Sequence, residues 1–187
     1  FDVTLSANGK TTLSNADIVV DKLTIAGPGT TLNVASTGTL YSLVDINQIA
    51  GAVNVDGALG TNGDYTLLTG LVSGKGSIWT PYFTSIGGTI APGSETAIGT
   101  LTFHGNVILA SATGTYIKLG ASGTSDRIAV QSTFTDQQGV PYDGIADLGG
   151  TLAFGGVAGS TIRYGNHYTI VTAQGGVAGH FDTVLPI

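Results

Sequence analysis

The sequence predicts an all-β fold of the solenoid type, in which short strands stack along one axis. Composition is the first indication: 30 of the 187 residues are glycine and only 10% are charged, against about 25% in ordinary soluble domains. Glu95 is the only glutamate, so the residues that normally build helix surfaces are scarce. Threonine, valine, isoleucine and leucine are frequent instead, and they favour strands.

Strand-like runs that alternate apolar and polar residues are the second indication. Turn sequences such as Gly27-Pro28-Gly29 and Asn62-Gly63-Asp64 separate them. Burying one Leu or Ile contributes about 1.5–3 kcal/mol, while fixing each residue costs about 1–2 kcal/mol, so strands this short need stacked neighbours. The predicted strands are 23–25, 31–34, 39–41, 52–55, 65–68, 99–103, 116–119, 127–130 and 151–154.

An internal repeat is the third indication. Residues 51–78 and 150–181 both run from a short strand through a glycine-rich turn to Tyr-Thr, two aliphatic residues and Thr, and then to a second turn. Repetition of one supersecondary unit is what a solenoid predicts. We place one boundary near Gly93, with irregular coils over 1–93 and longer strands over 94–187. Residues 131–147 form the most polar long stretch, and we expect them to project from the stack as a loop.

Charge and cysteine content exclude several classes of function. The net charge is −6, and the six Lys and Arg residues are scattered, so nothing can neutralise a run of phosphates or an anionic membrane surface. No segment approaches the length of a membrane-spanning helix. Cysteine is absent, which suits a chain that is exported unfolded. Phe1 is not a translation start, so we expect further residues upstream.

Six motifs occur in order in the second half of the chain. GGTIAPG, IGTLTFHGNVIL, GTYIKLG and SDRIAV lie within residues 87–130, and LGGTLAF and YTIVTAQGGVAGHFDTV within residues 148–184. This succession resembles the C-terminal passenger region of bacterial autotransporters, the proteins of type V secretion, where it is called the autochaperone or passenger-associated transport repeat. The resemblance covers about residues 87–187.

The resemblance implies a fold and a route of export. The fold is a right-handed parallel β-helix with a capping, β-sandwich-like region at its C-terminal end. The route leads through the periplasm and across the outer membrane to the cell surface, through a β-barrel formed by a later part of the same polypeptide. Residues 94–187 would then emerge first and fold unaided, offering an edge on which residues 1–93 stack.

Histidine and serine residues do not predict a metal or hydrolase site. Alternation places Leu101 and Phe103 inward and His104 toward solvent, while His167 and His180 lie far along the chain, and separated histidines make poor zinc sites. The Gly-x-Ser-x-Gly pattern of a serine hydrolase is absent, and we interpret Ser94, which follows Pro-Gly, as a turn residue. We therefore predict no metal, no cofactor and no catalytic residue.

Paired carboxylates could form the site of a polysaccharide-degrading enzyme or could bind calcium. The closest pairs are Asp17 with Asp21 and Asp143 with Asp147, and we interpret both as solvated rather than as an acid–base pair. The segment 60–64 resembles half of a calcium-binding repeat, but the tandem pattern is missing.

Two further sets of residues carry expectations. Asp126 is expected to start a strand through an Asx turn, and Arg127 and Arg163 to cover strand edges. Trp79, Tyr82 and Phe83 form the densest aromatic cluster, which either fills a corner of the core or, if exposed, forms a patch that binds a glycan or a host protein.

Three functions follow from these observations. The first is a structural, surface-displayed passenger segment that is not an enzyme and that aids its own secretion. The second is an adhesin surface for a host protein or glycan, through Trp79, Tyr82 and Phe83. The third, favoured least, is a polysaccharide-degrading β-helix enzyme.

Overall fold

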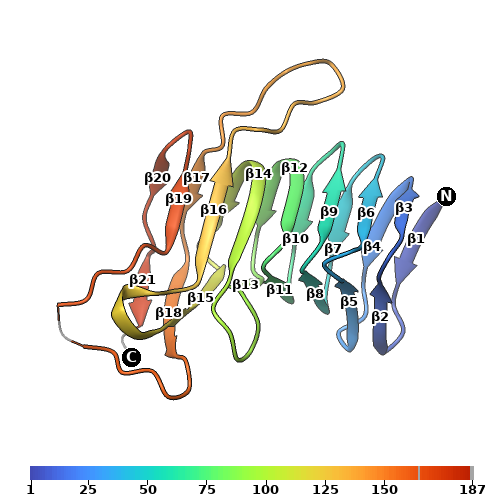
Figure 1. The fold of residues 1–187 in the computed structure, drawn as a ribbon. Coiled ribbons are helices and arrows are strands. Elements are labelled where there is room, and N and C mark those ends of the chain that lie inside the picture. Colours follow the sequence, from blue (N-terminus) through green and yellow to red (C-terminus); the bar gives the residue numbers. More distant parts are fainter. Residues whose placement is uncertain (164, 186–187) are drawn as a thin grey trace.

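The structure, a computed structural model, describes residues 1–163 and 165–185. In this part of the chain, 21 short strands wind into successive coils that stack along one axis (Figure 1). The ladders between the named strands are all parallel. The predicted all-β solenoid is thus confirmed, and its parallel sheets are consistent with a parallel β-helix.

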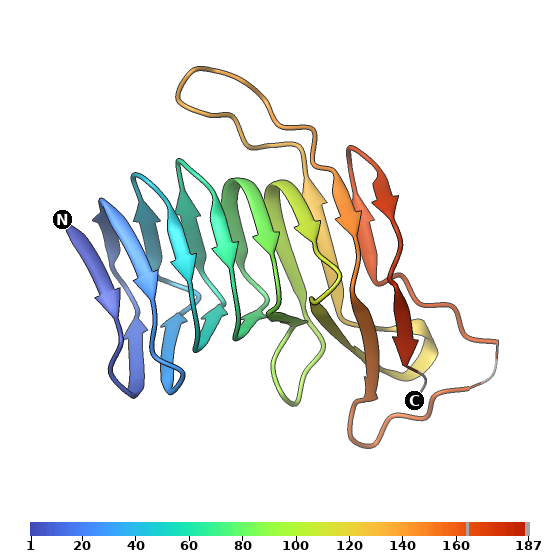
Figure 2. The same ribbon diagram turned by 180° about the vertical axis from the view of Figure 1, so that it is seen from behind.

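The chain visits three walls in a fixed order, one strand in each, before it returns to the first. Wall 1 is an eight-stranded sheet, and walls 2 and 3 are joined into a thirteen-stranded sheet, because β12 and β14 run through both. Figure 2 shows the stack from behind. A one-turn 3-10 helix, η1 (Ala121–Gly123), follows β15.

Wall 1 contains β2 (Gly9–Leu13), β5 (Thr30–Val34), β8 (Ala52–Val55), β11 (Leu71–Gly74), β13 (Thr89–Pro92), β15 (Gly114–Leu119), β18 (Thr151–Gly156) and β21 (Thr183–Leu185). Wall 2 contains β3 (Asp17–Val20), β6 (Thr39–Ser42), β9 (Ala58–Thr61), the first parts of β12 (Ser77–Ser85) and β14 (Thr100–Leu109), β16 (Arg127–Gln131) and β19 (Val171–Ala173). Wall 3 contains β1 (Asp2–Leu5), β4 (Lys22–Ile25), β7 (Ile46–Gln48), β10 (Tyr65–Leu67), the second parts of β12 and β14, β17 (Ala146–Leu148) and β20 (Val177–Gly179).

The core consists of side chains that recur in register from coil to coil. Because alternate residues of a strand face opposite ways, parallel pairing stacks like positions into rows, and each large apolar side chain in a row contributes about 1.5–3 kcal/mol. Tyr65 packs edge-on against Phe83, with ring centroids 4.9 Å apart, and donates a hydrogen bond to Gln48. One such buried row in wall 3 contains Leu23, Ile46, Tyr65, Phe83, Val107 and Ala146.

Coil length changes near the predicted boundary at Gly93. In wall 1, Thr31 pairs with Ala52 and Leu71 pairs with Thr89, so these coils are short. Gly114 pairs with Thr151, which makes a coil nearly twice as long. The extra length forms loops, and residues 132–145 project from the stack as predicted (Figure 1), although 146 and 147 already belong to β17. The sheets continue across Gly93, so the division into 1–93 and 94–187 stays a prediction.

The internal repeat corresponds only in part to repeated structure. The first strands of the two copies, β8 and β18, both lie in wall 1. The Tyr-Thr segments do not correspond, because β10 lies in wall 3 whereas β19 lies in wall 2. The second copy has a longer connection before its Tyr-Thr segment, so the same short motif leads into a strand of a different wall.

Gly105 marks the corner at which β14 passes from wall 2 to wall 3. Its φ is +114°, in a region that side chains rarely adopt. A Cβ there would lie 1.9 Å from the carbonyl oxygen of Thr80 on the preceding coil. The neighbouring strand β12 turns the same corner, where its register shifts between Trp79 and Tyr82. Glycine is therefore required at this corner.

Candidate functional site

A buried ion pair joins Lys118 of β15 to Asp126, the residue before β16. The Lys118 Nζ lies 2.6 Å from Oδ2 of Asp126, and the two side chains are 7% and 0% exposed. Removing two charges from water is costly, and further hydrogen bonds offset that cost. Asp126 accepts the backbone N–H groups of Lys118 and Gly99 at 2.8 and 2.9 Å, and Lys118 also donates to the carbonyl of Pro92.

These bonds tie β15, which contains Lys118, to three other segments. Pro92 ends β13, Gly99 precedes β14, and Asp126 precedes β16. The loop between Gly93 and Gly99 is closed further by a two-way backbone pairing of Gly93 with Gly74, at 2.7 and 3.0 Å. The ion pair therefore fixes the path of the chain where the coils become longer.

The expected role of Asp126 was wrong. The carboxylate does not make an Asx turn at the start of its own strand, since its acceptors are used by Gly99, 27 positions earlier, and by Lys118. Sequence reasoning missed Lys118 altogether. The one available signal was a lysine in the apolar run of β15, which needs a buried partner if it is covered.

Trp79 and His104 form the centre of an aromatic row on the outside of wall 2. Their rings lie 3.5 Å apart between centroids and are parallel to within 4°. The row continues to Tyr41, because Gly60 of β9 lies between them in register and leaves room. A Cβ at Gly60 would lie 2.7 Å from the Tyr41 ring. Register thus gathers side chains that are far apart in the sequence.

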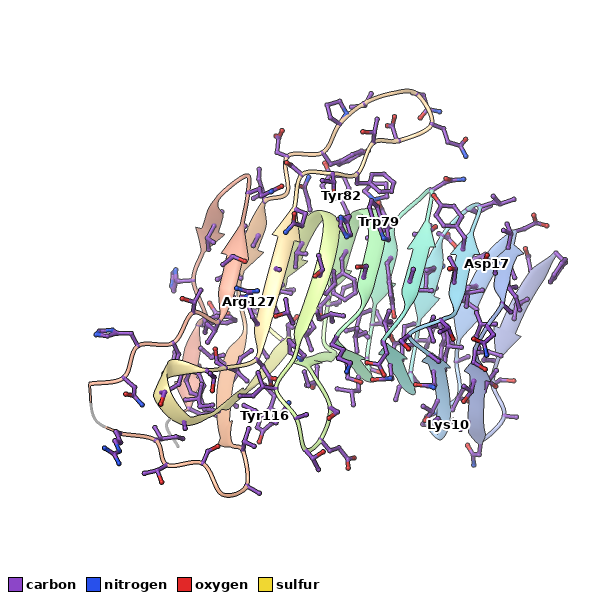
Figure 3. All side chains as sticks on the ribbon, viewed as in Figure 1. Lys10, Asp17, Trp79, Tyr82, Tyr116 and Arg127 are labelled. Atoms are coloured by element: carbon purple, nitrogen blue, oxygen red, sulfur yellow. The ribbon has the colours of Figure 1, made fainter. Side chains whose placement is uncertain are left out.

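A second aromatic group lies at the base of the projecting loop. Tyr82 packs edge-on against Tyr142, with centroids 5.5 Å apart, and Tyr142 packs against Phe134 at 5.6 Å. The loop is also attached through Thr133, whose hydroxyl bonds to Nδ1 of His104. Figure 3 shows Trp79 and Tyr82 close to the base of this loop. We call Tyr41, Trp79, Tyr82, His104 and Tyr142 the aromatic surface, with Phe134 buried beneath Tyr142.

The two alternatives for Trp79, Tyr82 and Phe83 apply to different residues of the cluster. Phe83 is completely buried and packs between Tyr65 and Phe103. Tyr82 is 40% exposed, and Trp79 is half-buried. Adjacent residues of a strand face opposite ways, so Phe83 belongs to the core while Tyr82 belongs to the surface.

Burial shifts the pKa of several groups near this surface. Desolvation lowers the pKa of His104 below its ordinary value, because a charged imidazole is disfavoured where water is excluded. Desolvation likewise raises the pKa of Asp64, with a smaller rise from the nearby charge of Asp45 and an opposing hydrogen bond from the backbone of Tyr82. The pKa of Tyr142 is raised by desolvation and by the charge of Asp136.

His104 faces outward from wall 2 as expected, while Leu101 and Phe103 are buried. His167 and His180 are exposed and lie in other parts of the stack. Within residues 1–163 and 165–185, no three His, Asp or Glu side chains gather as metal ligands would. The three histidines are therefore not brought together.

The acidic pairs and the arginines occupy the surface. Asp17 is exposed in β3, Asp21 binds the amino group of Phe1, and Asp143 and Asp147 are exposed in the projecting loop and β17. Arg127 is exposed at the start of β16 (Figure 3), and Arg163 is exposed in a loop. The segment 60–64 forms the corner between β9 and β10, where Asn62 bonds to Tyr41 and Leu43.

No protein-family model matches the sequence, and the comparison with curated proteins finds no match. Within residues 1–163 and 165–185, the structure contains no helix long and apolar enough to cross a bilayer.

Proposed function

We propose that this chain is a structural segment of an exported, surface-displayed passenger of the autotransporter kind, and that residues 94–187 nucleate its folding. In this proposal the chain is not an enzyme. Its partner is the outer-membrane β-barrel of the same polypeptide, reached through the periplasm. Right-handed coiling and a C-terminal cap, as the resemblance implies, are part of the proposal.

The observation that carries the proposal is the difference between the two halves of the stack. Coils before Gly93 are short and contain most of the main buried core, from Val20 to Ile90. Coils after it are longer, and the buried pair of Lys118 and Asp126 connects β15 to the end of β13, the start of β14 and the start of β16. Lys118 and Asp126 are only 8 positions apart in the chain, and contacts that close such short loops form early in folding.

Handedness and the cap have separate support. Strand-to-strand crossovers in parallel sheets are right-handed in about 98% of cases, which favours a right-handed coil. A stack of parallel strands needs protection at its ends. A small second core of Ile117, Leu119 and Leu152 lies in β15 and β18, and Tyr168 and Ile170 of the long connection before β19 pack against it, which suits a cap.

Refolding of three matched chains tests the proposal. Residues 94–187 alone should regain β-structure by circular dichroism after dilution from urea, residues 1–93 alone should not, and 1–187 should refold at the rate of 94–187. The variant Asp126→Asn should slow refolding of 1–187, because it weakens the proposed nucleus. Independent refolding of 1–93 with failure of 94–187 would refute the proposal.

A second candidate function is adhesion through the aromatic surface. The observation that favours it is the exposure of Tyr82 beside Tyr142 and beneath the projecting loop. Aromatic rings with polar edges suit contacts to a protein or a glycan. Loss of cell binding in Tyr82→Ala, with unchanged folding and unchanged binding in Tyr116→Ala, would support it.

A further inference from the structure

The outer face of wall 1 carries a groove of about 440 Å³ that lies apart from the aromatic surface. Its floor consists of outward side chains of β5, β8, β11 and β13, which include the small residues Ala52 and Ala91. Ser94 and Glu95 of the loop after β13 form one side, and Tyr116 of β15 lies at the end. Figure 3 shows Tyr116 on the opposite side of the stack from Trp79 and Tyr82.

A hydrogen-bonded row of polar side chains runs along wall 1, and two of its members, Asn54 and Ser73, line the groove. Asn33, Asn54 and Ser73 lie in register on three successive coils. Asn54 donates to Oδ1 of Asn33 at 2.7 Å, and Ser73 donates to Oδ1 of Asn54 at 3.2 Å. Since neighbouring strands are about 4.8 Å apart, the row offers an amide or a hydroxyl at a regular interval along the axis.

The side of the groove is held in a fixed position. The loop that carries Ser94 and Glu95 is closed at one end by the pairing of Gly93 with Gly74, and at the other by the bond from Gly99 to Asp126. A preorganised site loses little entropy when it binds. The groove therefore does not depend on closure of a mobile loop.

Charge restricts what the groove accepts. Lys118 is the basic residue among the described groove-lining residues, and its ammonium is buried against Asp126 and the Pro92 carbonyl. Glu95 is exposed and contributes a negative charge. Anionic chains, such as acidic polysaccharides or nucleic acids, are repelled.

We propose that this groove binds a neutral glycan chain lying along the solenoid axis, independently of any role of the chain in secretion. The ring of Tyr116, which is 39% exposed, presents an apolar face on which a pyranose ring can stack. Glu95 and Ser73 offer oxygen acceptors for sugar hydroxyls, and Asn54 lies beside Ser73 on the preceding coil. An extended peptide is a poorer fit, because the backbone groups of β8 and β11 are already paired within wall 1, so β-augmentation has no edge to use.

Titration of the ¹⁵N-labelled chain 1–187 tests the proposal, with maltohexaose, cellohexaose and chitohexaose as neutral probes and hexagalacturonate as the acidic probe. At least one neutral hexaose should shift the resonances of Asn54, Ser73 and Glu95. Tyr116→Ala should weaken that binding about three- to tenfold, since an aromatic contact contributes about 0.5–1.5 kcal/mol beyond its buried area. Tyr116→Phe should retain binding, and Tyr82→Ala, which alters an equally exposed tyrosine on the other side, should leave it unchanged.

Three results would overturn the proposal. The first is that none of the three neutral hexaoses binds in the millimolar range. The second is that hexagalacturonate binds more tightly than every neutral probe. The third is that Tyr82→Ala weakens binding as much as Tyr116→Ala, which would place the glycan on the aromatic surface. The titration uses the folded chain, so its outcome is separate from the refolding test above.

Discussion

Tyr82 and Phe83 are consecutive residues of β12 that face opposite sides of the wall, so that Tyr82 is 40% exposed while Phe83 is fully buried. Phe83 packs against both Tyr65 and Phe103, at 4.9 and 4.7 Å between ring centroids. A core aromatic row and a surface aromatic group therefore meet at one peptide bond. This arrangement separates what stabilises the stack from what is free to bind.

The substitution Phe83→Ala should lower the free energy of unfolding by about 3–5 kcal/mol, because it opens a cavity among aromatic rings. Tyr82→Ala should change it by about 0.5 kcal/mol or less, as is usual for exposed sites. Urea unfolding followed by circular dichroism measures both. Equal losses in the two variants would contradict the assignment of Phe83 to the core.

Asp126→Asn should cost about 3–5 kcal/mol, because the Lys118 ammonium would remain buried without its counter-charge. Asp17→Asn, an exposed carboxylate in β3, is the matched control and should have little effect. The double variant Lys118→Met with Asp126→Asn should recover most of the loss, because no unpaired charge is left. If the double variant is as unstable as Asp126→Asn, the cause is not the unpaired charge.

Gly105→Ala should destabilise the chain far more than Gly139→Ala. Both glycines have a positive φ, which costs an alanine about 1–2 kcal/mol. Only at Gly105 would the new Cβ also meet backbone, at 1.9 Å from the Thr80 carbonyl, whereas Gly139 has nothing within 4 Å. Thermal unfolding of both variants separates the cost of the dihedral from the cost of the clash.

Acidification should weaken the wild-type chain through His104. Its folded-state pKa is lowered by burial, so between that pKa and the unfolded value of about 6.5 the unfolded chain binds more protons. Stability then falls as the pH decreases through this window. The melting temperature of His104→Gln should fall less from pH about 7.5 to about 5.5.

The exposed His180 supplies the control for that experiment. His180→Gln should keep the wild-type dependence on pH, because its side chain is exposed in the folded state as well. If acidification lowers the melting temperatures of His104→Gln and the wild type by the same amount, burial of His104 is not the source of the pH dependence.

Within a predicted strand, the sequence predicts well which face each side chain occupies. It predicts the contacts between coils poorly. Alternation along Leu101, Phe103 and His104 places each side chain on the correct face, because the strand period of two is a local property. The row of Tyr41, Trp79 and His104 depends on the register between coils of unequal length. No local pattern encodes that register, so the row was not predicted.

The segment around Pro81 was not predicted as a strand, so the sequence left open whether Trp79, Tyr82 and Phe83 are buried or exposed. Without a predicted strand over residues 77–85, alternation could not place Tyr82 and Phe83 on opposite faces. In the structure β12 accommodates Pro81 at the corner, where the register shifts. The pair of Lys118 and Asp126 was missed for a related reason, because it depends on how the chain returns after η1.

The parallel ladders give this molecule a direction-dependent response to load. Their hydrogen bonds point along the solenoid axis, so traction between the two ends would open one coil at a time rather than shear a whole sheet. Each released coil before Gly93 would lengthen the chain by about 60–70 Å, at roughly 3.3–3.6 Å per extended residue. The coil from Gly114 to Thr151 would yield nearly twice that length, and its stretch between Lys118 and Asp126 would extend only after that ion pair breaks. Under tension, the stack would therefore extend coil by coil, and the ion pair would delay part of the extension of one long coil.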